Sequence, residues 1–410
     1  MTLSSSSQHE GSTVHRSGAL ARYVAAAALA RSADGGAVVG VVLLATSSGE
    51  GGRVAGLLGA CITAPHMLGP FLARRIDLAS DGRKVIFSAC ILYAFAFGTG
   101  VLTFGHVSLW LTGALFALTG CCGPFLTGGI SSRLPSIVAK DQKSQRRAQA
   151  WDVATYGIGG TIGPSIVAAI SAWWAPAEAA LCLAAASLIA AILVMRLPYA
   201  KPEHGGDPLA VPSVWATIKI MTRDGRLRRT LYMTMLVAFS MAALPITAVH
   251  MTSELHVQAA NAAVLTAAYG IGNLSGSVAV MLRPLSGSPD LLMTRLSGLI
   301  LIGLIAVLSS FNLVMAACAY WMAGALNALF FASTLAARSE YAPTKARGQV
   351  FLWVAALKIT SGSAGTATAG VLTGVQISVP LLAGMAIISI GAMSSIIERG
   401  VEARRVLHPS

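Results

Sequence analysis

The chain has 410 residues, of which 55% are hydrophobic and 11% are charged, and its mean hydropathy is +0.70. A soluble domain of this length does not need so much apolar surface, so the composition excludes a soluble protein and predicts one that crosses a bilayer many times. The formal net charge is +13, but the basic residues stand at the ends of apolar runs, which favours lipid headgroups over nucleic acid as their partners.

Apolar runs of about 20 residues, enough to cross a hydrocarbon core of roughly 30 Å, recur along the whole chain. We expect twelve transmembrane helices, because a backbone that faces lipid has to satisfy its own hydrogen bonds. The runs lie near residues 19–46, 54–74, 84–104, 107–130, 148–171, 178–196, 230–251, 258–282, 293–311, 313–337, 348–372 and 377–397.

These runs divide the chain into five parts. We expect a disordered cytoplasmic tail at 1–18, a six-helix bundle at 19–196, a cytoplasmic linker at 197–229, a second six-helix bundle at 230–398 and a cytoplasmic tail at 399–410. Several prolines forbid a long helix in the linker. Residues 213–221 are interpreted either as a short amphipathic helix on the membrane surface or as an unstructured connector.

The distribution of Lys and Arg predicts the orientation. With the amino terminus inside, only Arg53 falls in an outer loop, and only Arg31 and Lys358 fall deep within spans. All other basic residues lie in tails, inner loops or inner span ends. Because short cytoplasmic loops are enriched in Lys and Arg, we expect both termini in the cytoplasm.

The fifth span carries a seam of small residues. Residues 157–164 read Gly-Ile-Gly-Gly-Thr-Ile-Gly-Pro, so Gly159 and Gly163 are four residues apart and share one side of a helix. Glycines at this spacing let another helix backbone approach closely. Pro164 removes one backbone donor, and we expect a bend just beyond the seam.

The two halves of the chain repeat each other. Arg147-Ala-Gln149 is echoed by Arg347-Gly-Gln349, and residues 63–69 align with residues 266–272, which places His66 opposite Tyr269. Each half has six spans, so the repeats share one topology and are related by an axis along the membrane normal.

The twelve spans, the cytoplasmic linker and the repeat resemble the major facilitator superfamily. Residues 69–84, after the second span, read Gly-Pro-Phe-Leu-Ala-Arg-Arg-Ile-Asp-Leu-Ala-Ser-Asp-Gly-Arg-Lys and look like the family's loop signature. They depart from it at Ala73 and Leu78 and by two extra residues before Gly82. The resemblance implies that Asp77 and Arg83 form a charged latch on the inner gate.

Two further matches point to a subgroup. Gly159 to Pro164 is similar to the fifth-helix motif of 12-span drug:proton antiporters, and Arg133 matches a basic position at the inner end of the fourth span. An arginine at that place is also explained as a positive-inside anchor. The resemblance implies a pseudo-symmetric, all-α membrane transporter.

Four titratable groups lie at similar depth within spans: Arg31, Asp34, His66 and Lys358. A charge there costs at least about 2.5 kcal/mol, so each needs a role. Arg31 and Asp34 are either a neutralising pair that fixes helix packing or a site where Asp34 exchanges a proton beside Arg31. Lys358 has to meet Asp34, face water or lose its charge, and it could carry a proton or receive an anion.

His66 is interpreted mainly as a structural histidine, because Pro65 and Gly69 suggest a helix irregularity that frees a backbone carbonyl for it. Asp152, one turn into the fifth span, is expected at the inner gate. Tyr269, Asn327 and Tyr320 either line an aromatic cavity or pack in a core. No catalytic residue, metal site or cofactor is expected, and no phosphate-binding loop is present, so energy has to come from a gradient.

These observations favour a multi-pass transporter of the cytoplasmic (cell inner) membrane that exports small amphipathic molecules, drug-like or metabolic, by proton antiport. The alternative is a proton-coupled importer of a small, anionic metabolite, and a third is a non-transporting membrane sensor or partner protein. The expected partners are a small-molecule substrate, protons and the lipid bilayer. We expect no nucleic acid and no obligate protein partner, and hence a monomer.

Overall fold

The computed structural model describes residues 5–50, 52–199, 211–258, 261–372, 376 and 378–407. Residues 200–210 of the predicted linker, residues 1–4 of the predicted first tail and residues 408–410 of the last one lie outside this part. The described residues form helices and no strand. The all-helical fold predicted from the apolar runs is therefore confirmed.

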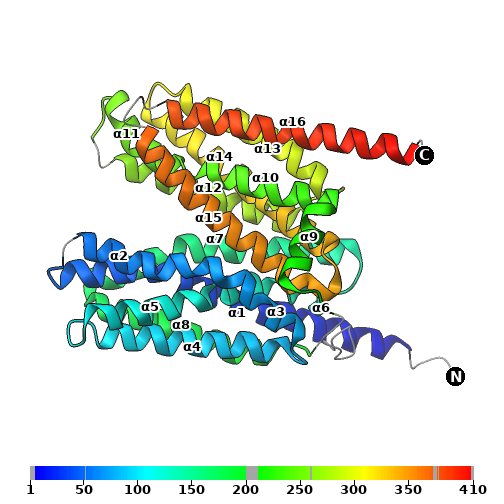
Figure 1. Ribbon diagram of the computed structural model, residues 1–410, viewed down its shortest axis with the longest axis horizontal. Helices are drawn as coiled ribbons and strands as arrows, with labels where there is room; N and C mark the ends of the chain where they lie inside the picture. The colour runs from blue at the N-terminus through cyan, green and yellow to red at the C-terminus, as the bar shows by residue number, and fades with distance from the viewer. Residues whose placement is uncertain are drawn as a thin grey trace. The chain divides into compact units, whose positions relative to one another are not determined.

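The helices fall into two compact units, of which unit 1 contains residues 1–214 and 343–356. Its elements are α1 (Ser5–Ser47), α2 (Gly52–Thr63), η1 (Ala64–Leu68), α3 (Gly69–Leu78), α4 (Gly82–Leu102), α5 (Leu109–Pro124), η2 (Phe125–Gly129), α6 (Leu134–Ile137), α7 (Gln142–Trp173), α8 (Pro176–Met195), η5 (Thr344–Ala346) and the first ten residues of α15 (Arg347–Leu372). In Figure 1, α4, α5 and α8 run side by side within this unit.

Unit 2 contains residues 215–342 and 357–410. Its elements are α9 (Val214–Arg223) from its second residue on, α10 (Gly225–Met241), α11 (Leu244–Glu254), α12 (Ala262–Leu282), α13 (Pro289–Leu308), α14 (Leu313–Tyr341), the remainder of α15 and α16 (Val379–Leu407). α9 is a helix where the sequence left a helix or a connector open. The predicted division into tails, bundles and linker stays a prediction.

The lengths of the helices agree with the predicted spans. Eleven helices in the described chain are long and apolar enough to cross a membrane, and the number rises to twelve if one bent pair counts as a single span. That pair joins Val54–Leu68 to Phe71–Leu78 at an angle of 55°. The bend falls at η1, the irregularity that Pro65 and Gly69 predicted.

The predicted glycine seam joins α1 to α7. Gly159 lies against the backbone of Arg31, and a Cβ atom at Gly163 would stand 2.6 Å from the carbonyl oxygen of Ser32. Gly160 has open space around it, so it takes no part in the contact. α7 continues through Pro164 to Trp173. The absence of side chains at Gly159 and Gly163 therefore lets two span backbones touch.

A close contact in unit 1 recurs in unit 2. A Cβ atom on Gly123 of α5 would collide with the imidazole of His66 in η1, and one on Gly324 of α14 would collide with the backbone of Tyr269 in α12. The sequence aligned His66 with Tyr269. In each half, a glycine thus lets one span approach closely the aligned position on another span.

Large apolar side chains remain exposed along the outer faces of the helices. Phe95, Ile302 and Met393 are more than half exposed. Contiguous apolar surface of this kind is rare on soluble monomers. It is the surface that lipid covers around a bundle of transmembrane helices.

Candidate functional site

A buried ion pair joins α1 to α7 in unit 1. Arg31 Nη1 lies 2.7 Å from Asp152 Oδ1, and the two side chains are only 2% and 1% exposed. The sequence assigned Arg31 to the cavity and Asp152 to the inner gate. The structure brings them together at the glycine seam, where Gly159 leaves room for the Arg31 backbone.

Polar groups on three helices complete the surroundings of this pair. Tyr23 donates a 2.5 Å hydrogen bond to Asp152, and the Ser131 hydroxyl donates to the other carboxylate oxygen at 2.8 Å. The Arg31 guanidinium also donates to Ser131 and Thr155 and lies 3.6 Å from the centre of the Tyr156 ring. Both carboxylate oxygens of Asp152 and both terminal nitrogens of Arg31 thus have partners inside unit 1, as burial of an ion pair requires.

Asp34, one turn after Arg31, has a different partner. His66 Nε2 lies 3.3 Å from Asp34 Oδ1 and 3.4 Å from Oδ2, and His66 Nδ1 lies 3.0 Å from the carbonyl oxygen of Ile62. The bend at η1 supplies this carbonyl, as the sequence suggested for a structural histidine. The structure adds the carboxylate, which makes the contact a titratable pair.

The Asp34 and His66 pair lies near the middle of its spans. At 1.5 Å per residue, Asp34 is about 24 Å from the start of the candidate span Gly18–Ser47 and about 20 Å from its end. The side chains of His66 and Asp34 are 7% and 13% exposed, so Asp34 is less enclosed than Asp152. Gly123 makes room for both side chains.

Lys358 lies at the middle of α15, in unit 2. Its Nζ atom is 3.7 Å from the centre of the Phe331 ring, and the guanidinium carbon of Arg338 is 5.9 Å from the same point. Among the described residues, no hydrogen bond or ion pair to Lys358 is formed. Two cations thus share one aromatic ring on α14.

The predicted aromatic cavity residues lie in unit 2 with different degrees of burial. Tyr320 is fully buried, and its hydroxyl donates to the carbonyl oxygen of Leu244, so it packs in the core. Tyr269 packs against that core, and its backbone is held against Gly324. Asn327 is half-buried on α14. Of the two interpretations, core packing describes Tyr320.

Asp77 caps the start of α15. Its two carboxylate oxygens accept the backbone amides of Gly348 and Gln349, each at 2.9 Å. The first amides of a helix have no partner within the helix and carry partial positive charge, so a carboxylate stabilises them. Phe71 packs edge-on against Trp353 beside this contact, with ring centres 5.7 Å apart.

Arg83 has its contacts elsewhere. Its guanidinium forms an ion pair of 2.8 Å with Asp81, and it donates to the carbonyl oxygen of Leu197 beyond α8. These hydrogen bonds from Arg83 hold the pKa of Asp81 below its usual range. Asp77 and Arg83, which the resemblance assigned to one latch, therefore hold different helix ends.

Arg133 lies beside the same loop. A Cβ atom on Gly82 would stand 2.7 Å from its Nη1 atom. Burial lowers the pKa of Arg133, and the neighbouring charge of Asp77 opposes that shift. The structure thus brings Arg133, matched separately at the inner end of the fourth span, next to Gly82 and close to Asp77 of the loop motif.

A second ionic cluster, which the sequence analysis missed, ties three helix ends in unit 2 and is buried at Arg229 and Asp290. Arg229 of α10 lies 3.1 Å from Asp290 of α13 and 2.9 Å from Glu402 of α16, and Arg399 of α16 lies 3.7 Å from Asp290. Tyr341 also donates to Asp290. Each of these residues lies at the end of a span. The positive-inside rule already explained the arginines there, so nothing in the sequence indicated an ionic cluster.

The chain matches the family model of the Major Facilitator Superfamily over residues 24–367. The chain belongs to this superfamily. It is therefore a secondary membrane transporter with many spans and is not an enzyme. No curated protein matches the sequence significantly.

Solved structures of the superfamily share the fold at low identity. The human organic anion transporter MFSD10 (TETRAN) is 16% identical, with a TM-score of 0.70 over 92% of this chain and 99% of that one. A bacterial homologue of the iron transporter ferroportin in an outward-facing state is 13% identical, with a TM-score of 0.73 over 93% and 99%. The E. coli fucose:proton symporter FucP is 14% identical, with a TM-score of 0.66 over 92% and 98%. These identities show the fold alone.

Within this family fold, the midplane groups divide into two kinds. Arg31 and Asp152 neutralise each other in a closed network, whereas Asp34 and His66 form a pair of groups that can each gain or lose a proton. Among the described residues, no three His, Cys, Asp or Glu side chains are arranged to hold a metal ion. The roles of the individual site residues stay predictions.

Proposed function

We propose that the chain exports small amphipathic molecules across the cytoplasmic membrane in exchange for protons, by alternating access. The supporting observation is the contact of 3.3 Å between His66 and Asp34 near the middle of the candidate spans. Protons entering the cell would bind this pair, and substrate binding would favour its deprotonated form. Export is then coupled to proton entry, because the proton and the substrate stabilise different conformations of the transporter, one inward-facing and the other outward-facing.

The partners of the two carboxylates explain why Asp34 is the proposed proton carrier. Asp152 accepts hydrogen bonds from Tyr23 and Ser131 and faces the guanidinium of Arg31, so its two oxygens are already engaged. Asp34 faces an imidazole, the side chain that changes charge between about pH 5 and 8. A proton can therefore be held or released at Asp34 and His66 without breaking a permanent ion pair.

Asp77 supplies the proposed gate. The carboxylate holds the first turn of α15 through two amides, and this contact can break and reform as a unit. We expect both termini and the loop 69–84 on the cytoplasmic side, which makes the contact an inner latch. Arg133 supports the carboxylate, and Arg83 anchors the adjoining loop to the end of α8.

Dye export tests the proposal. Cells without their own efflux pumps would carry the wild type, Asp34→Asn or His66→Gln, and accumulation of lipophilic fluorescent dyes would be measured before and after a protonophore. The wild type should lower accumulation until the protonophore is added. Asp34→Asn should abolish this effect. Full gradient-driven export by Asp34→Asn would show that the carboxylate does not carry the coupled proton.

The chain offers matched controls for both variants. His250 Nδ1 lies 3.1 Å from the carbonyl oxygen of Ile246, the same backbone contact that His66 makes, and no ion pair to an acid accompanies it among the described residues. His250→Gln should leave export unchanged. Asp141 caps α7 from an exposed position, so Asp141→Asn controls for the charge change. Equal losses in variants and controls would show damage to the fold instead of the coupling.

A second candidate function, uptake of a small anionic metabolite with protons, is favoured by Lys358. Its ammonium, at the middle of α15, and the guanidinium of Arg338, in the last turn of α14, approach the same Phe331 ring. A carboxylate on the substrate would supply the negative charge that two neighbouring cations favour. Such a substrate would bind in unit 2 at Lys358.

Transport in proteoliposomes distinguishes the two candidates. Uptake of radiolabelled mono- and dicarboxylates would be compared for the wild type, Lys358→Gln, Lys358→Arg and Lys219→Gln, the last being an exposed lysine on α9. Anion uptake lost in Lys358→Gln and retained in Lys358→Arg would support the importer. No anion uptake by the wild type, together with dye export, would support the exporter.

A further inference from the structure

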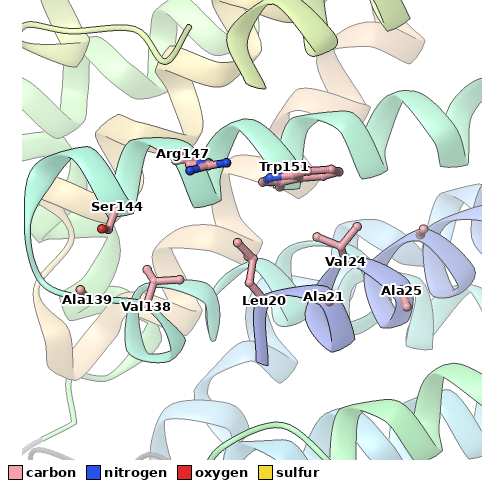
Figure 2. A pocket seen from close by; sticks show the side chains of 10 residues that line it. Leu20, Ala21, Val24, Ala25, Val138, Ala139, Ser144, Arg147 and Trp151 are labelled. Atoms are coloured by element: carbon pink, nitrogen blue, oxygen red, sulfur yellow. The ribbon is translucent and has the colours of Figure 1, made fainter. Parts of the chain in front are cut away.

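Residues 20–28 of α1 and residues 144–151 of α7 border an apolar groove in unit 1. Its volume is about 780 Å³. Small and branched side chains of α1 between Leu20 and Ala28 form one wall, and Val138 and Ala139 form another. Figure 2 shows Leu20 and Val24 pointing toward α7, which carries Trp151.

The groove runs along the exposed side of α1, ahead of the glycine seam. At Gly159 and Gly163 the backbones of α1 and α7 touch. Ala21 and Ala25, ahead of this contact on α1, are exposed and line the groove, whereas Tyr23 between them is buried and donates a hydrogen bond to Asp152 of α7. A single apolar chain can therefore lie along these small exposed residues.

One end of the groove is basic. Arg147 and Ser144 of α7 line it, and Figure 2 shows Arg147 beside Trp151 on the same helix. Arg147 is exposed and has no hydrogen bond or ion pair within the described chain. Lys140 and Lys143, just before it, are exposed as well. Asp141, between the two lysines, is exposed too and accepts the amide of Ser144, so this end carries three basic groups against one carboxylate. The net positive charge at this end is therefore available to a ligand.

The dimensions match one leaflet of a bilayer. The candidate spans begin at Gly18 in α1 and at Gln142 in α7, so the basic end lies where both helices enter the membrane. From Leu20 to Ala28 the wall is about 12 Å long at 1.5 Å per residue. Half of a hydrocarbon core is roughly 15 Å. Trp151 also suits this depth, because tryptophan gathers near membrane interfaces.

We propose that this groove binds an anionic phospholipid, with one acyl chain along α1 and the phosphate at Arg147. The apolar wall is suited to an acyl chain. The exposed guanidinium, with a hydroxyl and two lysines close by in the sequence, favours a negatively charged headgroup. The bound lipid would fill the groove that α1 and α7 border. This site lies apart from the Asp34 and His66 pair and does not depend on which solute is carried.

Lipid retention tests the site. Full-length protein would be reconstituted in a mixture of phosphatidylglycerol and phosphatidylcholine with identical acyl chains, extracted in mild detergent, and its retained lipids counted by native mass spectrometry. The wild type should retain phosphatidylglycerol above its share of the mixture. Arg147→Gln should lower this enrichment by about five-fold, the contribution of one basic residue at an anionic surface.

Two matched controls keep the test specific. Arg295→Gln removes an exposed arginine from α13 in unit 2 and should leave the enrichment unchanged. Ala25→Phe fills the groove and should lower lipid retention, whereas Ala185→Phe adds the same ring at an exposed site on α8 and should not. Correct insertion of each variant is checked by a monodisperse profile in detergent.

Three results would overturn the proposal. The first is equal retention of the two lipids by the wild type. The second is an equal loss in Arg147→Gln and Arg295→Gln, which would reflect net charge alone. The third is lipid retention unchanged by Ala25→Phe while dye export is lost, which would make the groove an entry site for an amphipathic substrate.

Discussion

The guanidinium of Arg31 lies 2.7 Å from the carboxylate of Asp152 on another helix, while Asp34, three residues along the same helix, pairs with His66. Removing one partner of a fully buried ion pair leaves an unpaired buried charge. We therefore expect Asp152→Asn and Arg31→Gln each to destabilise the protein by about 3–5 kcal/mol. Thermal unfolding of the purified protein in detergent measures this loss.

The double variant separates pairing from packing. In Arg31→Met with Asp152→Leu, no charge is left unpaired, so most of the lost stability should return. Asp34→Asn serves as the comparison and should cost less, because Asp34 is less enclosed and faces a histidine. If Asp152→Asn and Arg31→Gln unfold at the same temperature as the wild type, the ion pair does not stabilise unit 1.

The glycine seam gives a second prediction. Gly163→Ala places a methyl group 2.6 Å from the carbonyl oxygen of Ser32, so α1 and α7 have to move apart, and we expect a cost of about 1–3 kcal/mol. Gly160→Ala, three residues earlier on the same helix, meets no atom within 4 Å and should be neutral. Both variants are compared by yield of monodisperse protein and by thermal unfolding. A neutral Gly163→Ala would contradict the close approach.

Much of the fold could be predicted because a membrane constrains the chain so strongly. A helix that crosses the bilayer needs an apolar run of fixed length, so runs such as 84–104 and 178–196 indicated α4 and α8 directly. Pro65 and Gly69 indicated the bend at η1. Gly159 and Gly163 indicated a close contact between α7 and another helix, which is α1 in the structure. These signals are local in sequence.

Pairings within the site could not be predicted in the same way. The depth of Arg31, Asp34, His66 and Asp152 follows roughly from counting residues, but the partner of each depends on how α1 is rotated against α7 and η1. Arg31 and Asp152 are 121 residues apart. Sequence spacing therefore suggested that Arg31 pairs with Asp34. In the folded chain, Arg31 instead pairs with Asp152 and Asp34 with His66, each on another helix.

The unit 2 cluster provides a third prediction, about redundancy. Arg229 faces Asp290 at 3.1 Å and Glu402 at 2.9 Å, with Glu398 further off at 3.7 Å, so losing one carboxylate leaves it others. Asp290→Asn should therefore cost about 1–3 kcal/mol, less than Asp152→Asn. The double variant Asp290→Asn with Glu402→Gln should cost more than the sum of the two single changes. Strict additivity in thermal unfolding would contradict the shared role of Arg229.

The last prediction concerns the carboxylate that caps α15. Asp77→Ala removes the acceptor of the amides of Gly348 and Gln349, whereas Asp77→Asn keeps one oxygen acceptor without the charge. Loss of a helix cap costs about 0.5–2 kcal/mol, so local opening should expose these amides about two- to thirty-fold more often in Asp77→Ala, with a smaller effect in Asp77→Asn.

Hydrogen exchange read by mass spectrometry over residues 343–356 measures this opening. Asp224→Ala is the matched control, because Asp224 caps α10 through the amide of Leu227 and makes no contact with α15 among the described residues. It should speed exchange at the start of α10 only. Exchange at Gly348 and Gln349 as slow as in the wild type would show that α15 is held by other contacts, such as that of Phe71 with Trp353.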